Sequence, residues 1–209
     1  MLTVYNLRLG QDFQSNCYVV ANDKKEAFAV DIGGEAQELI KFLSSKELTL
    51  KKIFLTHGHY DHFRGTAETV KNTGAKVYIH REDEAMMTDA ERSLAYAIGF
   101  RSFNSVDEYE VTEDGDVIDF SGVPVKVIHT PGHTKGGVCY VCENKIFSGD
   151  TLFRMSIGRT DFPGGDFNEL MASLKKLKNL SENMDYEVYP GHESTTTLLN
   201  EIERNPYMR

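Results

Sequence analysis

The sequence predicts a single α/β domain, residues 1–209, in which helices cover β-sheets. Short apolar segments of strand type occur in pairs joined by turns, and helical patterns follow several of them. A length of 209 residues suits one domain, and no Ser/Gly/Pro-rich tract, charge block or close repeat marks a linker. Hydrophobic residues make up 40% and charged residues 26%, which excludes collagen-like, coiled-coil and wholly disordered classes.

The first half of the sequence predicts strands that alternate with helices. Strands at 17–20 and 27–30 flank a turn at 22–25, and a helix begins near Glu35, where apolar residues recur at helical spacing. A strand at 52–55, a helix at 65–72 and a strand at 77–79 follow. The segment 81–103 is predicted to be mainly helical, and its weakly periodic apolar residues are expected to form a lid or part of the core: Met86, Met87, Tyr96, Phe100 and Phe103.

The second half predicts more strands and two helices. Val123, Val125 and Val127 alternate along one strand, and strands at 138–141 and 146–147 follow. Asp166, with Glu169 three residues later, resembles a capping box and begins a helix. The expected apolar face of that helix consists of Phe167, Leu170, Met171, Leu174 and Leu177. A strand at 186–189 and a helix at 194–204, ended by Pro206, complete the chain.

Charge and cysteine content indicate the compartment and the partners. Acidic residues number 32 and basic residues 23, and the net charge of −9 disfavours binding to nucleic acid or to anionic membranes. No apolar run is long enough to span a membrane, and the N-terminus lacks signal-peptide features. Cys139 and Cys142 are three apart on a predicted strand and point to opposite faces, so we expect thiols rather than a redox pair. We expect a cytoplasmic protein, and its oligomeric state stays open.

One short segment carries a cluster of metal-ligand side chains. Directly after the strand at 52–55 come His57, His59, Asp61 and His62. Neutral imidazoles and carboxylates suit zinc, iron and manganese, and four such groups cannot all bind one ion and leave a position open for water. The spacing therefore indicates that the ligands are divided between two metal ions.

Three further side chains of ligand type, His133, Asp150 and His192, each follow a glycine at the end of a predicted strand. Strand ends are where a sheet presents active-site groups. The seven groups divide evenly between two ions: His57, His59 and His133 on one, Asp61, His62 and His192 on the other, with Asp150 bridging. Seven core or capping residues would not be expected to share this pattern, whereas His80 and His129 lack it and are expected to be structural.

These segments resemble the successive metal-binding motifs of the metallo-β-lactamase fold superfamily: T-H-G-H-Y-D-H at 56–62, T-P-G-H-T at 130–134, S-G-D-T-L-F at 148–153 and Y-P-G-H-E at 189–193. The turn at 31–34 matches the family's early D-x-G turn, so the likeness covers essentially the whole chain. The resemblance implies a four-layer αββα sandwich of two mixed sheets with a dinuclear metal site on one edge. The family's ligand assignment agrees with the division given above.

Within this superfamily the sequence most resembles glyoxalase II (hydroxyacylglutathione hydrolase), particularly its short bacterial forms, on segments 150–153 and 157–165. Class B β-lactamases generally carry a cysteine where Asp150 stands, flavodiiron proteins replace His59 with glutamate, and the nucleases carry added basic modules. These branches are therefore disfavoured. Full-length glyoxalase II also has a C-terminal helical domain that supplies much of the glutathione site, and only residues 193–209 follow His192 here.

The expected reaction is hydrolysis of a small-molecule thioester of the lactoylglutathione type. Two divalent ions would share a bridging hydroxide, and zinc is expected in preference to iron or manganese. Asp61 and Asp150 are the catalytic residues expected to orient this hydroxide. A thiolate leaves readily near neutral pH, which suits a site without an obvious general acid. Arg159 is the candidate for binding a substrate carboxylate, and a structural pair with Asp161 is the alternative.

Two other functions compete with hydrolysis. A mononuclear iron persulfide dioxygenase shares the fold and the H-x-H-x-D-H motif, and it binds iron through the equivalents of His57, His133 and Asp150. No sequence feature decides between the two, although the contexts at 162–165 and 191–193 favour hydrolysis. A non-catalytic scaffold would be marked by lost ligands, and none of the seven is missing.

Overall fold

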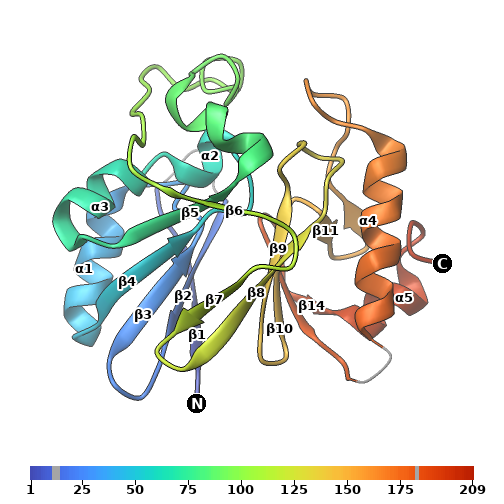
Figure 1. Ribbon diagram of the computed structural model, residues 1–209, viewed down its shortest axis with the longest axis horizontal. Coiled ribbons are helices and arrows are strands. Elements are labelled where there is room, and N and C mark those ends of the chain that lie inside the picture. The colour runs from blue at the N-terminus through green and yellow to red at the C-terminus, as the bar shows by residue number, and fades with distance from the viewer. Residues whose placement is uncertain (11–14, 182–183) are drawn as a thin grey trace. The chain divides into compact units, whose positions relative to one another are not determined.

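The computed structural model describes residues 1–10, 15–181 and 184–209. By their contacts these residues form two compact units. Unit 1 comprises Met1–Ile79 and Glu84–Val111, and unit 2 comprises His80–Asp83 and Thr112–Arg209. Each unit is built on its own six-stranded sheet (Figure 1). The single domain predicted for residues 1–209 stays a prediction.

The sheet of unit 1 has the strand order β1-β2-β3-β4-β5-β6. Its strands are β1 (Thr3–Arg8), β2 (Asn16–Ala21), β3 (Glu26–Val30), β4 (Thr49–Phe54), β5 (Lys76–His80) and β6 (Glu110–Thr112). β1, β2 and β3 are antiparallel neighbours, whereas β3, β4 and β5 run parallel. Parallel neighbours need long crossovers, which contain α1 (Ala36–Lys46), α2 (Tyr60–Phe63) and α3 (Thr66–Thr73). The segments after β3 and after β4 therefore leave the sheet at the same edge.

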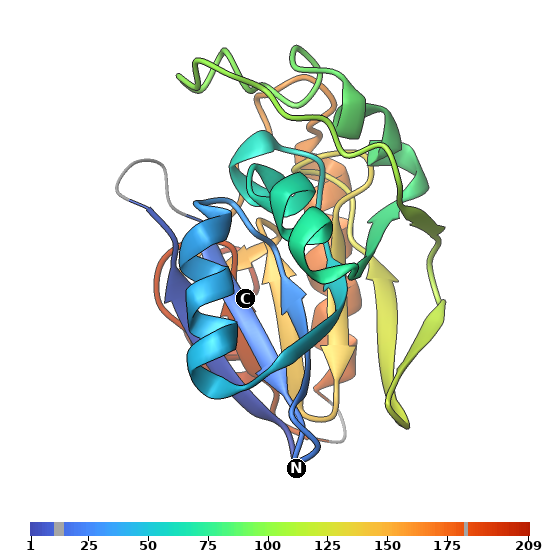
Figure 2. The ribbon, with the colours of Figure 1, turned by 90° about the vertical axis from the view of Figure 1, so that its left-hand side faces the viewer.

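Helix α1 covers one face of this sheet, as Figure 2 shows. It forms because apolar residues recur at helical spacing, and it ends where Glu47 takes a left-handed conformation and its N–H bonds back to the last turn. Leu39 and Leu43 of the helix pack in one buried cluster with Val19 and Ala29 of the strands. Burying such side chains stabilises the fold by about 1.5–3 kcal/mol each.

Unit 2 contains a second sheet, in the order β14-β13-β10-β9-β8-β7. Its strands are β7 (Val117–Phe120), β8 (Val123–His129), β9 (Val138–Cys142), β10 (Lys145–Gly149), β13 (Glu187–Pro190) and β14 (Thr196–Thr197), and β11 (Leu152–Phe153) pairs with β12 (Ser156–Ile157) as a separate hairpin. β8 and β10 are both antiparallel to β9, and β13 is parallel to β10. The carboxyl ends of β8, β10 and β13 therefore share one edge.

Two helices pack on the sheet of unit 2, α4 (Phe167–Leu180) and α5 (Leu198–Arg204) (Figure 1). Asp166 caps α4 as predicted, since its carboxylate accepts the N–H groups of Asn168 and Glu169. Leu174 and Leu198 belong to one buried cluster with residues of the strands. Among the described residues, no helix combines the length and the apolarity that a membrane crossing requires.

Most predicted elements form, but three expectations were wrong, and β1 is among the strands that were not predicted. The segment 81–103 is not mainly helical: it contains the 3₁₀ helix η1 (Arg81–Thr88) and then turns, because it lacks a periodic apolar face. The last helix begins at Leu198 rather than near 194, since Thr196 and Thr197 pair with β13. Phe167 is 50% exposed and does not belong to the apolar face of α4. Strand β1 was not predicted, because its apolar residues Val4, Tyr5 and Leu7 do not alternate regularly with polar ones.

Phe100 and Phe103 of segment 81–103 pack against the core of unit 1, whereas Tyr96 is 57% exposed. The rings of Phe100 and Phe103 lie 5.1 and 5.0 Å from the ring of Tyr60, and Met87 is fully buried. Tyr60 also accepts a hydrogen bond from the Asn104 N–H. These contacts favour the core interpretation of the segment over the lid.

Candidate metal centre

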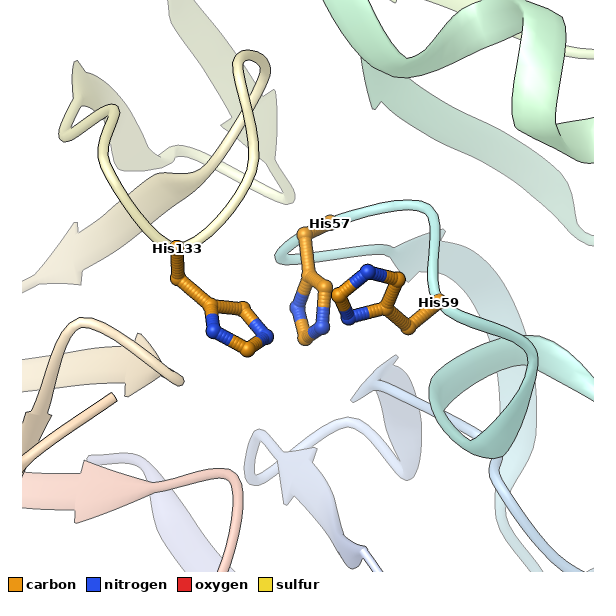
Figure 3. A group of neighbouring side chains, drawn as sticks. All are labelled: His57, His59 and His133. Atoms are coloured by element: carbon orange, nitrogen blue, oxygen red, sulfur yellow. The ribbon is translucent and has the colours of Figure 1, made fainter. Parts of the chain in front are cut away.

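The predicted ligands of unit 1 lie in the loop after β4, which carries His57 and His59, and on α2, which carries Asp61 and His62. The rings of His57 and His59 meet edge to face with centroids 4.8 Å apart (Figure 3), and the ring of His62 lies 4.1 Å from that of His57. All three side chains are buried. Burial of polar imidazoles without bonding partners is unfavourable, so this packing needs either hydrogen bonds or a bound cation.

Asp31 orients this loop from the end of β3. Its carboxylate accepts hydrogen bonds from the Thr56 backbone N–H and hydroxyl, both at 2.8 Å, and it lies 2.9 Å from Nδ1 of His62. A carboxylate at Nδ1 keeps the proton on that nitrogen and leaves Nε2 as the metal-binding atom. His62 Nε2 lies 3.8 Å from Asp61 Oδ2, so the two atoms can approach a common ion. In the sequence Asp31 stands out only as part of a turn, because its partners Thr56 and His62 lie 25 and 31 positions further along the chain.

Close backbone packing fixes Asp61. The Ser15 hydroxyl donates to the Asp61 carbonyl at 2.7 Å, and a Cβ atom at Gly33 would stand 1.6 Å from the same carbonyl oxygen. Gly58 is similarly constrained, because a Cβ there would lie 2.7 Å from atoms of Met86. Both glycines are therefore required by space rather than by unusual backbone angles.

In unit 2 the three predicted ligands emerge from one edge of the sheet, after β8, β10 and β13. Oδ2 of Asp150 lies 3.4 Å from Nε2 of His133 and 3.6 Å from Nε2 of His192. Two ligands at about 2.0–2.2 Å from one tetrahedral ion stand roughly 3.3–3.6 Å apart. One carboxylate oxygen is therefore at ligand spacing from both histidines.

Backbone and side-chain contacts hold His133, which is labelled in Figure 3, in unit 2. Its Nδ1 lies 2.7 Å from the Arg159 carbonyl oxygen, which favours Nδ1–H and leaves Nε2 for a metal. The loop that carries it is fixed by buried Asp83, whose carboxylate accepts the Thr134 hydroxyl and the Gly136 N–H at 2.7 Å each. Sequence reasoning missed Asp83, because 51 residues separate it from Thr134.

Arg159 extends its side chain away from the protein interior. Its guanidinium bonds both carboxylate oxygens of Asp161 at 2.7 Å and stacks over the ring of Phe162. Bonding to Arg159 lowers the pKa of Asp161 to about 2. Nη1 of Arg159 makes no hydrogen bond within the described part of the chain, so its two N–H groups can donate to a ligand.

His80 and His129 form a separate pair. Their rings stack with centroids 4.1 Å apart, and burial, followed by the neighbouring His129, lowers the pKa of His80 to about 4. The His/Asp clusters of the described residues that could hold a metal ion include neither histidine. The three cysteines are free and buried, and burial raises the pKa of Cys139 and Cys142 to about 11.

Comparison with known proteins identifies the family. Residues 10–192 match the family model of the Metallo-beta-lactamase superfamily. The chain belongs to this superfamily. The superfamily's fold is the predicted one, and the family resemblance drawn from the motifs is confirmed.

Several superfamily relatives align over most of this chain. Hydroxyacylglutathione hydrolase GloC of Haemophilus influenzae is 33% identical over 94% of this chain and 93% of its own length. The probable metallo-hydrolase YqgX of Bacillus subtilis is 30% identical over 93% and 92%. The solved structure of BLEG-1 B3 metallo-beta-lactamase matches 99% of both chains with 34% identity and a TM-score of 0.91. That of TTHA1623 in a di-iron-bound form covers 98% of this chain and 100% of its own, with 34% identity and a TM-score of 0.86.

These relationships support a metal-dependent hydrolase. The donor set fits a dinuclear metal site of this superfamily, because unit 1 supplies His57, His59, Asp61 and His62 and unit 2 supplies His133, Asp150 and His192. Two of the five histidines also have Nδ1 occupied by a carboxylate or carbonyl oxygen, as metal-binding imidazoles require.

Proposed function

We propose that this superfamily member is a dinuclear metal-dependent hydrolase that cleaves thioesters of the hydroxyacylglutathione type. The observation that carries the proposal is the position of Asp150 Oδ2, at 3.4 Å from Nε2 of His133 and 3.6 Å from Nε2 of His192. A carboxylate oxygen at ligand spacing from two histidines suits a bridge between two ions. The likeness to hydroxyacylglutathione hydrolase GloC supports the substrate class.

We assign the ligands as the sequence divides them. His57, His59 and His133 would hold one ion, Asp61, His62 and His192 would hold the other, and Asp150 would be shared by both. Zinc is the expected metal, with iron or manganese as alternatives that imidazole and carboxylate ligands also accept. When bound, two such ions polarise a carbonyl and lower the pKa of water to about 7, which provides a nucleophile at neutral pH.

The protein's own groups orient the reaction. Asp61 and Asp150 are the carboxylates that hold the attacking water by hydrogen bonds and accept its proton. Asp31 keeps His62 in the required tautomer, and the Arg159 carbonyl does the same for His133. A departing thiolate needs no proton from the protein, whereas an amide nitrogen does, so a thioester makes the smaller demand on the site.

The test combines metal analysis with activity assays on the purified protein. We expect two metal equivalents per chain and hydrolysis of lactoylglutathione, and in Asp150→Ala we expect loss of at least one equivalent and of the hydrolysis. One tightly bound iron, with oxygen uptake on glutathione persulfide and no thioesterase activity, would identify the dioxygenase instead. We expect a small-molecule substrate with no nucleic-acid or membrane partner, since the net charge is −9.

Hydrolysis of β-lactams is a second candidate, favoured by the 34% identity to BLEG-1 B3 metallo-beta-lactamase. The same metal chemistry serves a strained amide, but an amide nitrogen must be protonated as it leaves. Parallel assays of a cephalosporin and a glutathione thioester distinguish the two substrates. A kcat/KM for the cephalosporin above that for the thioester would overturn the thioesterase proposal.

A further inference from the structure

Two polar residues are fully buried where α5 ends. Glu201 and Asn205 are both 0% exposed, and we name this pair the C-terminal clamp. A buried carboxylate is strongly destabilising unless its oxygens are hydrogen-bonded. Both oxygens of Glu201 accept two hydrogen bonds each, so the carboxylate is fully satisfied. Such a complete network is expected to fix the segments that donate to it.

The clamp holds the β11–β12 hairpin. The Met155 N–H donates to Glu201 Oε2 at 2.7 Å, and Asn205 Nδ2 donates to the Ser156 carbonyl at 3.0 Å and the Phe153 carbonyl at 3.4 Å. Met155 has φ of +62°, an uncommon value for a residue with a side chain. Hydrogen bonds from α5 therefore stabilise a turn that local preferences disfavour.

The clamp also holds the segment that follows His192. The Thr196 hydroxyl donates to Glu201 Oε1 at 2.7 Å, and Asn200 Nδ2 donates to the same oxygen at 2.9 Å. Thr196 pairs with Val188 of β13, so the turn that carries His192 is fixed at both ends. The hairpin contributes as well, because the ring of Phe153 lies edge-on to that of His192 at 6.1 Å.

From the hairpin the contacts continue to the other two ligands of unit 2. Asp150 precedes β11 by two residues, and Gly158 follows β12. A Cβ atom at Gly158 would stand 1.8 Å from the Asp150 carbonyl oxygen and 3.3 Å from Nδ1 of His133. The next residue, Arg159, accepts the Nδ1 hydrogen bond of His133. The strand that leaves the hairpin therefore sets the positions of Asp150 and His133 together.

We propose that Glu201 and Asn205 are positioning residues for the metal ligands His133, Asp150 and His192. The inference rests on the metal site of the proposed function, but not on its substrate. The clamp holds the hairpin and the turn after β13 at fixed positions, so the three ligands keep their spacing before a metal binds. Loss of the clamp leaves the sheet and α4 in place and loosens the ligands.

The experiment measures metal affinity by competition with a chelator, using zinc ions, and records the visible spectrum of the protein loaded with cobalt(II). The variants are Glu201→Gln, which replaces one accepting oxygen with a donor, and Asn205→Ala, which removes the hairpin contacts without burying a charge. Glu203→Gln is the matched control, since Glu203 is an exposed glutamate on the same helix. Ile202→Ala is a second control, because Ile202 packs on the core of unit 2 and takes part in none of the clamp hydrogen bonds described above.

We expect zinc affinity to fall roughly 10- to 100-fold in Glu201→Gln and Asn205→Ala, with a changed cobalt spectrum, as for other residues that support metal ligands. Glu203→Gln should match the parent protein, and Ile202→Ala should lower thermal stability with little change in affinity. If Glu201→Gln does not fold, the zinc affinity of Asn205→Ala relative to the parent protein tests the inference by itself. Clamp variants that bind zinc as tightly as Ile202→Ala overturn the inference. A parent protein that binds no zinc, iron or manganese overturns the proposed function itself.

Discussion

The carboxylate of Asp31 lies 2.9 Å from Nδ1 of His62, and both side chains are almost completely buried. Thirty-one residues separate them in the chain, but the parallel pairing of β3 and β4 brings the segments after both strands to one edge. The same carboxylate holds the backbone of Thr56, next to His57. A single acidic residue thus orients two parts of the ligand loop.

Asp31→Asn should therefore weaken metal binding without abolishing the fold. Asparagine presents one accepting oxygen and one donating nitrogen, so it cannot serve both Thr56 and His62 as the carboxylate does. We expect metal affinity to drop roughly 10- to 100-fold, measured by chelator competition. Asp107→Asn is the control, because it makes the same substitution at an exposed aspartate. Equal metal affinity in the two variants would show that metal binding does not depend on the contact between Asp31 and His62.

Asp150→Ala should have a larger effect. It removes the oxygen that stands at ligand spacing from both His133 and His192, and two bound cations would then face each other without a shielding charge. We expect loss of at least one metal equivalent and a fall in turnover of several orders of magnitude, with the circular dichroism spectrum retained. His80→Ala should do neither. Comparable damage from His80→Ala and His133→Ala would contradict the ligand assignment.

The ligand motifs could be predicted because each is local. A strand, a tight turn with glycine and then a ligand-type side chain can be read within ten residues, and the strand directions explain why these ends meet at sheet edges. The supporting residues could not be found in this way. Asp83 bonds Thr134, 51 positions away, and Glu201 bonds Met155, 46 positions away, and no pattern in the sequence marks such pairs.

The segment 81–103 could not be predicted for a different reason. Its helical prediction rested on composition, but 3₁₀ turns have no 3.6-residue periodicity to detect. Phe100 and Phe103 are held by their contacts with Tyr60 rather than by local preference. Strand β1 also forms through tertiary contacts. It pairs with β2, although its residues do not alternate between buried and exposed positions.

Arg159→Ala tests the proposed recognition of a substrate carboxylate. Nε and Nη2 of Arg159 bond Asp161, but Nη1 can still donate to an anionic ligand. We expect a selective loss of kcat/KM, roughly tenfold or more, for a glutathione thioester over a small neutral thioester. Asp161→Asn, which releases the guanidinium, should not reduce that selectivity. Equal losses on both thioesters in Arg159→Ala would assign the side chain to bracing its loop.

His80 should make the fold sensitive to mild acid. Its pKa in the folded protein is about 4, lowered first by burial and then by His129, against 6.5 for an unperturbed histidine. The Glu82 N–H also donates to Nδ1 of His80, and protonation would break that bond. As pH falls below about 6.5 the unfolded chain takes up this proton and the folded chain does not, so stability is complete above that pH and declines towards pH 4.

His80→Phe keeps an aromatic ring against His129 and removes the titration. Urea unfolding at pH 7, 6, 5 and 4 should show the parent protein losing about 1–3 kcal/mol more stability than the variant over this range. All metal ligands are shared by the two proteins, so their own titration cancels in the difference between the two curves. At pH 7 the difference in unfolding free energy between the parent protein and the variant reports only packing. His80 is then neutral in the folded chains and in most of the unfolded chains. Parallel curves from pH 7 to pH 4 would contradict the lowered pKa of His80.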